Sequence, residues 1–394
     1  MSDLSDSEQR KEMPVVAAGV DGVPPEEGFL GWLCLTGAFF GLFCTIGFIN
    51  AIGVFQKTYE SDMLRAYTSS DISWIFAVQL CLMWAPGPLF GRLIDTYGPA
   101  PVLYPCSVLC VFALCMTSLA DKYYQIFLAQ GLAFGIGSGG VFTTCLVCVG
   151  QRFVRRRGLA TGIAASGSSL GGVIFPIFFD RVMQNVGFYG AVRYTALFIG
   201  VLLVATCVCV RARLPRNKWN RETPWFDVSL FKEKQFSFYV LGAWLVMWGL
   251  WAPFDYLSSM AGVAGFSDTL ALYLISIVNS TSIPSRLLPP HLSDTYGYFN
   301  VLTISSFATG ASMLLLWLPF NYHHSHAGII VFAAVYGFFN GAVVSLLMPC
   351  VAKAISPVNR GTWTIMLKMA VSLHKCLVPH CTWCFPSRRS HLPP

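Results

Sequence analysis

Two stretches of this chain align without a gap, GRLIDTYGPAPVL at residues 91–103 and PHLSDTYGYFNVL at residues 290–302. Both contain the word DTYG, at positions 95–98 and 294–297, so the copies lie 199 residues apart in a chain of 394. A match of this kind at an offset of half the chain indicates an internal duplication rather than two unrelated turns. The word is therefore expected at equivalent places in two halves of one fold.

The composition predicts that this fold lies in a membrane. Hydrophobic residues make up 55% of the chain and charged residues only 11%, with a mean hydropathy of +0.59. An ordinary soluble domain carries roughly 25% charged residues. Because the alternating pattern of a barrel is absent, we expect an all-α polytopic membrane protein. Ten apolar runs are long enough to span, at residues 28–55, 72–94, 101–120, 124–150, 159–179, 194–210, 236–257, 267–287, 299–320 and 328–351.

These runs divide the chain into two unequal halves. The stretch GTWTIMLKMAVSL (361–373), after the tenth run, is too short to span, and the composition changes abruptly behind it. The predicted organisation is a disordered cytosolic tail (1–27), a six-helix half (28–210), a cytosolic central loop (211–235), a half with four helices (236–360) and an atypical tail with part of an eleventh helix (361–394).

Basic residues predict the orientation. With a cytosolic N-terminus, the inside segments hold 17 Lys and Arg residues and the outside loops hold 5. This bias is the positive-inside pattern, and we expect the plasma membrane as the location. The net charge of +7 belongs to these loops, so no nucleic-acid partner is needed to explain it. The lipid bilayer and a small-molecule solute are the expected partners.

The repeated motif has a physical logic at a cytosolic turn. Its glycines permit tight turning, and its carboxylate can meet basic side chains or the positive N-terminal end of a neighbouring helix. We assign a gating or structural role to Gly91, Arg92, Asp95, Gly98, Asp294 and Gly297. Pseudo-symmetry predicts that Asp294 lies at the start of the fifth helix, beside Arg155, Arg156 and Arg157, and that Asp95 faces the eleventh helix near Gly361.

The first copy of the repeat resembles the loop signature of the major facilitator superfamily. Gly91, Leu93, Asp95 and Gly98 match its pattern of Gly, any residue, Leu, any residue, Asp, two residues and Gly. The second copy departs from the pattern, because Pro290 stands in the place of the leading glycine. The resemblance implies two sets of six helices around a central site, of which the second set is incomplete here.

Two further stretches resemble the monocarboxylate-porter branch of that superfamily, and its fungal members in particular. They are EGFLGW at 27–32, before the first helix, and RFVRRRGLATGIAASGSSLG at 152–171, at the start of the fifth. The resemblance covers about residues 27–360. It implies secondary active or facilitated transport of a small organic solute, a monocarboxylate-like anion or a fungal metabolite, by alternating access.

Glycines are frequent in the fourth and fifth predicted helices and allow close helix packing. We expect the fifth-helix set to face the fourth-helix set. The two sets are Gly162, Gly167, Gly171 and Gly172, and Gly131, Gly135, Gly137, Gly139 and Gly140.

Polar side chains within the membrane are costly and are therefore the candidate solute-binding residues. They are Asn50, Gln79, Gln130, Asp255, Asn279, Arg286 and Asn340. The resemblance places Arg286 where the monocarboxylate family carries an arginine implicated in anion binding. The alternative is an arginine that extends to the cytosolic interface beside Asp294.

The identity of Asn50 bears on energy coupling. The resemblance places it where lactate carriers have a lysine that takes part in proton and substrate binding, and an amide carries no proton at physiological pH. Lactate-type symport is therefore not expected, and protons remain an open alternative as coupling ions.

Several function classes lack support in the sequence. A nucleotide-binding P-loop is missing, and so is a nucleophile or metal constellation, so neither an ATP-driven pump nor an enzyme is predicted. No cofactor and no metal are expected. The atypical tail at 361–394 leaves a second hypothesis open, a non-transporting or regulatory remnant of a transporter.

Overall fold

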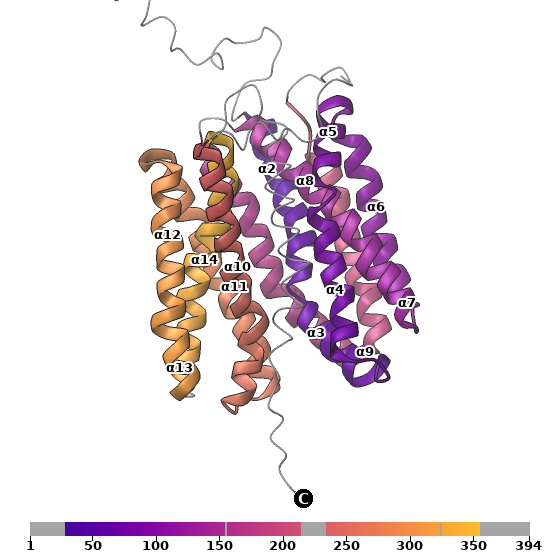
Figure 1. Cartoon of the computed structure of the whole chain (residues 1–394). Helices are drawn as coiled ribbons and strands as arrows, with labels where there is room; N and C mark the ends of the chain where they lie inside the picture. Colours follow the sequence, from indigo (N-terminus) through magenta and orange to yellow (C-terminus); the bar gives the residue numbers. More distant parts are fainter. Residues whose placement is uncertain (1–27, 154–155, 214–233, 324, 355–394) are drawn as a thin grey trace, which may run out of the picture.

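The computed structural model of the chain describes residues 28–153, 156–213, 234–323 and 325–354. All regular structure in these ranges is helical, which confirms the all-α prediction. The elements, with η for π-helical segments, are α2 (Phe29–Leu42), η2 (Phe43–Gly47), α3 (Ile52–Thr58), η3 (Tyr59–Met63), α4 (Ser69–Trp84), α5 (Gly87–Tyr97), α6 (Ala100–Thr117), α7 (Tyr123–Ile126), η4 (Phe127–Ala133), α8 (Phe134–Arg152), α9 (Arg157–Cys209), α10 (Lys234–Val263), α11 (Asp268–Tyr296), α12 (Tyr298–Ser312), η6 (Met313–Trp317), α13 (Leu318–His323) and α14 (His326–Ala354) (Figure 1).

Each predicted apolar run coincides with a helical segment. Within the described residues, seven segments are long and apolar enough to cross a membrane. One of them, α9, contains two predicted runs, because Gly187 breaks the helix with a φ of 73°. The runs at 236–257 and 267–287 lie on α10 and α11. The polytopic architecture is confirmed, and the exact number of spans remains a prediction.

The two copies of DTYG end two helices in the same way. Gly98 closes α5 with a φ of 88°, and Gly297 closes α11 with a φ of 93°. Each glycine donates its N–H to the carbonyl oxygen four residues earlier, over 2.9 Å to Ile94 and 3.0 Å to Ser293. Residues that have a Cβ rarely adopt this backbone conformation, which explains why glycine stands at both turns. The duplication therefore encodes one helix end twice.

Aromatic side chains fill the core of the first half. Phe48 lies 5.4 Å from Phe55 and 5.7 Å from Phe175 between ring centroids, and Phe55 lies 4.3 Å from Phe179. All four rings are buried, and they join the first membrane segment to the first part of α9. This packing holds the first part of α9 against the first membrane segment, while the opposite face of α9 contacts the second half.

Rows of glycines four residues apart pack against helices other than those expected. Gly131, Gly135 and Gly139 of the fourth segment lie against α4, near the backbone of Ile75, Gln79 and Met83 respectively. On α9, Gly171 crosses Gly47 so closely that a Cβ there would lie 2.7 Å from the Gly47 Cα. The predicted contact between the two glycine sets is wrong. Residues four apart share one helix face, and these faces turn towards α4 and the first segment.

The two halves meet along a seam between α9 and α11. At its middle, the hydroxyls of Ser169 and Ser282 are 2.6 Å apart. A Cβ at Gly172 would lie 2.7 Å from the Asn279 side chain, and a Cβ at Gly162 would collide with the backbone carbonyl oxygen of Arg286. The seam explains why α11 is less apolar than its neighbours, since its polar side chains face protein rather than lipid.

Candidate functional site

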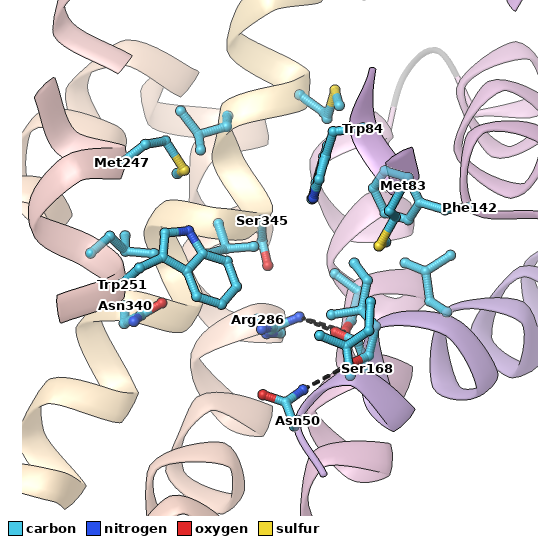
Figure 2. Close-up of a pocket in the computed structure, with 18 of the residues that line it drawn as sticks. Asn50, Met83, Trp84, Phe142, Ser168, Met247, Trp251, Arg286, Asn340 and Ser345 are labelled. Carbon is cyan, nitrogen blue, oxygen red and sulfur yellow. Dashed lines mark hydrogen bonds between the residues drawn. The ribbon is translucent and has the colours of Figure 1, made fainter. Parts of the chain in front are cut away.

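A cavity lies between the two halves. It encloses about 1070 Å³ of empty space, including its open mouth. The lining residues come from both halves, from the first membrane segment, α4, α8 and α9 on one side and from α10, α11 and α14 on the other (Figure 2). A cavity shared by two halves suits a molecule that must be exposed first to one side of the membrane and then to the other.

The wall of the cavity is mainly apolar and aromatic. Trp84 and Phe142 pack edge to face with ring centroids 4.9 Å apart on the side of the first half, and Trp251 and Met247 lie across from them (Figure 2). Sequence reasoning did not select these residues, because tryptophan and phenylalanine in an apolar run look the same whether they face lipid, core or cavity. Such a wall binds the apolar body of an organic solute.

Arg286 is the cationic group of the cavity. Its side chain is 8% exposed, and Nη1 donates to the carbonyl oxygen of Ala165 over 2.7 Å and to Oγ of Ser168 over 2.6 Å. Nε is buried and has no hydrogen-bond partner among the described residues. None of the described residues that line the cavity is Asp or Glu. Within the described lining, the positive charge of Arg286 therefore has no counter-charge.

This geometry rules out the alternative interpretation of Arg286. A side chain that extended to the cytosolic interface would lie near Asp294, eight residues or about 12 Å further along α11. The guanidinium instead turns inward and binds α9 across the seam. The interface interpretation is wrong, because the carbonyl of Ala165 and the hydroxyl of Ser168 hold the group inside.

The structure brings together four of the seven polar candidates. The side chain of Asp255 lies outside the described part of the chain. Asn50, Asn279 and Asn340 line the cavity with Arg286. The two glutamines do not line it. Gln79 is fully buried on α4, and Gln130 accepts a hydrogen bond from the Tyr59 hydroxyl over 2.5 Å within the first half. Sequence also missed Ser168, the serine that holds Arg286.

The motif aspartate of the second copy meets the start of α9. Asp294 accepts hydrogen bonds from the backbone N–H groups of Gly158 over 3.0 Å and Leu159 over 3.1 Å, and the Tyr298 hydroxyl donates to it over 2.7 Å. The first N–H groups of a helix have no partner within the helix, and its dipole favours a negative charge there. Asp294 thus lies where the duplication predicts, bound to backbone groups of the other half.

The basic residues predicted beside Asp294 are only partly described. Arg156 precedes α9 and Arg157 begins it, and Arg157 donates to the carbonyl oxygen of Gly150 over 3.0 Å. Arg155 lies outside the described residues, as does the eleventh helix expected to face Asp95. A Cβ at Gly91 would meet no described atom within 4 Å. The gating role of the first copy therefore stays a prediction.

The profile of the Major Facilitator Superfamily matches residues 29–379 of this chain. The chain belongs to this superfamily. The match extends beyond residue 360, where the sequence analysis ended the resemblance. The chain is 40% identical to an MFS-type transporter, hasB, of Aspergillus fumigatus over 355 residues, which are 87% of this chain and 79% of the relative. It is 39% identical to the agnestins efflux protein AgnL12 of Paecilomyces divaricatus over 323 residues, 82% of this chain and 73% of that protein.

A solved structure shares the fold. The human organic anion transporter MFSD10 superposes with a TM-score of 0.67 at 17% identity, over 89% of this chain and 92% of that one. At this identity the likeness concerns the fold alone. As a member of the superfamily, the present chain is a multi-pass membrane transporter of a small-molecule solute and not an enzyme.

Asp294→Asn should impair this transporter more than Asp95→Asn. The asparagine turns an N–H towards a backbone donor and removes the charge at the start of α9, which costs about 1–3 kcal/mol. We expect a lower thermal midpoint of the purified protein and about ten-fold slower solute uptake for Asp294→Asn alone.

A chimera with the eleventh and twelfth helices of a longer relative serves as the control. The predicted incomplete second half implies that the two substitutions become equally harmful in the chimera, because Asp95 would then gain a complete partner. Equal effects in both proteins would show that residues 361–394 do not weaken the first gate.

Proposed function

We propose that this transporter carries an organic anion with an apolar body and exports it by alternating access. The observation that carries the proposal is Arg286, a buried guanidinium in an apolar cavity whose described lining holds no carboxylate. A charge in such a place is costly unless a partner neutralises it. An anionic solute is the partner that the cavity can admit, and the aromatic wall would cover the rest of the molecule.

The relatives support export. Besides the agnestins efflux protein, the chain is 36% identical over 331 residues to a protein of Gibberella fujikuroi named the fujikurins efflux protein. The proposed solute is therefore a small secondary metabolite with an acidic group. The monocarboxylate-porter branch remains part of the proposal, since it rests on the stretch at 152–171 and on the position of Arg286.

Location and coupling belong to the same proposal. We place the chain in the bilayer of the plasma membrane with its N-terminus in the cytosol, on the strength of the basic residues in the predicted inner loops. The halves at 28–210 and 236–360 would then rock about the α9 and α11 seam. Asn50 argues against lactate-type proton symport, and the coupling ion is left open.

An exchange assay separates this function from a non-transporting remnant. Proteoliposomes that contain the full chain and unlabelled 2-naphthoate should take up labelled 2-naphthoate several-fold faster than protein-free liposomes, in a saturable way. Excess 2-naphthamide, which has the same rings without the charge, should not compete. Uptake no faster than in protein-free liposomes would favour the remnant, and competition by the amide would contradict the selection for an anion.

A further inference from the structure

The three asparagines of the cavity have their amide groups oriented by acceptors on their own helices. Nδ2 of Asn50 donates to the carbonyl oxygen of Ile46 over 2.9 Å, and Nδ2 of Asn279 donates to that of Ile275 over 3.0 Å. A carbonyl oxygen only accepts, so the nitrogen of each amide must face it. The amide oxygen of each residue consequently faces the other way.

Asn340 is oriented by a short relay. The Tyr336 hydroxyl donates its single proton to the carbonyl oxygen of Leu250 on α10. It can therefore only accept from Asn340, whose Nδ2 lies 2.8 Å from it. This relay holds the Asn340 oxygen away from Tyr336, and Figure 2 shows Asn340 beside Trp251 in the cavity.

The amide oxygens of Asn50 and Asn340 accept no hydrogen bond from any described residue. Asn340 is only 3% exposed. An acceptor in an apolar cavity costs free energy when a bound molecule displaces water from it without offering a donor. The cavity therefore favours a solute with a donor of its own.

The guanidinium presents the complementary group. Nη1 is committed to Ala165 and Ser168, while Nε has no partner among the described residues. Nε is enclosed by protein, so Nη2, which donates to none of the described residues, is the group that can meet a carboxylate oxygen in a charge-assisted hydrogen bond. Donor and acceptor positions thus lie in one cavity (Figure 2).

We infer that the solute is an organic acid whose apolar body carries a hydroxyl or N–H group, with its carboxylate on Arg286 and its donor on the amide oxygen of Asn340. The inference rests on the proposed function, because it assumes that an anion occupies Arg286. It adds a second requirement, a hydrogen-bond donor on the solute, to the negative charge that the proposed function already requires. An analogue of the same shape without the donor would leave the amide oxygen of Asn340 unpaired and bind more weakly.

The test uses three related probes and the purified full chain in equilibrium dialysis. They are 6-hydroxy-2-naphthoate, 6-methoxy-2-naphthoate, in which a methyl group replaces the donated proton, and methyl 6-hydroxy-2-naphthoate, which has the donor but no charge. We expect the hydroxy acid to bind about ten-fold more tightly than the methoxy acid. Asn340→Leu should reduce this ratio to about one, and the matched variant Gln130→Leu, outside the cavity, should leave it unchanged.

Tyr336→Phe provides a second variant in case Asn340→Leu does not fold. It keeps the ring and frees the Asn340 amide to rotate, so the ratio should fall towards one. Equal binding of the two acids to the natural chain would overturn the inference and leave the proposed function standing. Binding of the ester as tight as that of its acid would instead contradict the proposed anion site. Absence of binding by all three probes would overturn both.

Discussion

Arg286→Ala abolishes transport of organic anions while the protein still folds and reaches the membrane: this is the expected result with the largest effect. The guanidinium is the cation that lines the cavity opposite no described carboxylate, so its removal leaves an anionic solute without a partner in a desolvated site. Truncation of one member of a buried charge pair costs about 2–5 kcal/mol, which corresponds to a loss of transport of about 30-fold or more.

The stability of the same variant separates binding from structure. The substitution removes two hydrogen bonds, to Ala165 and Ser168, and it also removes a buried charge that has no described counter-ion. Because an uncompensated buried charge is itself destabilising, the thermal midpoint should stay unchanged or rise. A residue with a merely structural role would show the opposite, a lower midpoint together with the lost transport.

Two matched variants complete the experiment. Arg286→Lys keeps the charge but loses the planar arrangement of the guanidinium donors, so we expect weak residual transport with a raised KM. Arg193→Ala removes an arginine that contacts Ser118, neither of which lines the cavity, and should transport normally. Exchange of 2-naphthoate in proteoliposomes measures all three. Full activity of Arg286→Ala would eliminate the arginine as the anion site.

Gly162→Ala is the second substitution for which a large effect is expected. The added Cβ would collide with the backbone carbonyl oxygen of Arg286 and would lie 3.3 Å from Cβ of Pro290. A side-chain rotation cannot relieve a clash with backbone, so α9 and α11 must separate at the seam. We expect a cost of about 1–3 kcal/mol, seen as a lower thermal midpoint and at least about ten-fold slower exchange.

Controls for this substitution come from the same chain. Gly150→Ala on α8 places a Cβ where no described atom lies within 4 Å, and it should be neutral or slightly stabilising. Gly162→Ala should lower the stability of the Arg286→Ala variant by as much as it lowers that of the natural chain, since the obstructing oxygen belongs to the backbone. Wild-type stability and transport of Gly162→Ala would mean that the two halves do not approach as closely at this point.

The sequence predicts several residues of the candidate site, but it does not predict which polar residues line the cavity and which are buried elsewhere. Polarity within apolar runs selects Asn50, Asn279, Arg286 and Asn340 correctly as cavity residues, but it selects Gln79 and Gln130 by the same criterion. The cost of burying an amide is the same whether its partner is a solute or a tyrosine hydroxyl such as that of Tyr59. The sequence alone therefore cannot distinguish an amide that faces a solute from an amide that is bonded to another side chain.

The sequence by itself determined the features that depend on local chemistry. Transfer to hydrocarbon adds up residue by residue, so the apolar runs predict the helices, and the positive φ at Gly98 and Gly297 is a property of each turn alone. Only the tertiary structure decided which face each helix turns to which neighbour. The Arg286 contact with Ala165 joins residues 121 positions apart. The two predicted glycine sets turn to α4, α6, α11 and the first segment instead of each other. The rotation of a helix about its axis depends on the packing of all its neighbours at once, which no single stretch of the sequence contains.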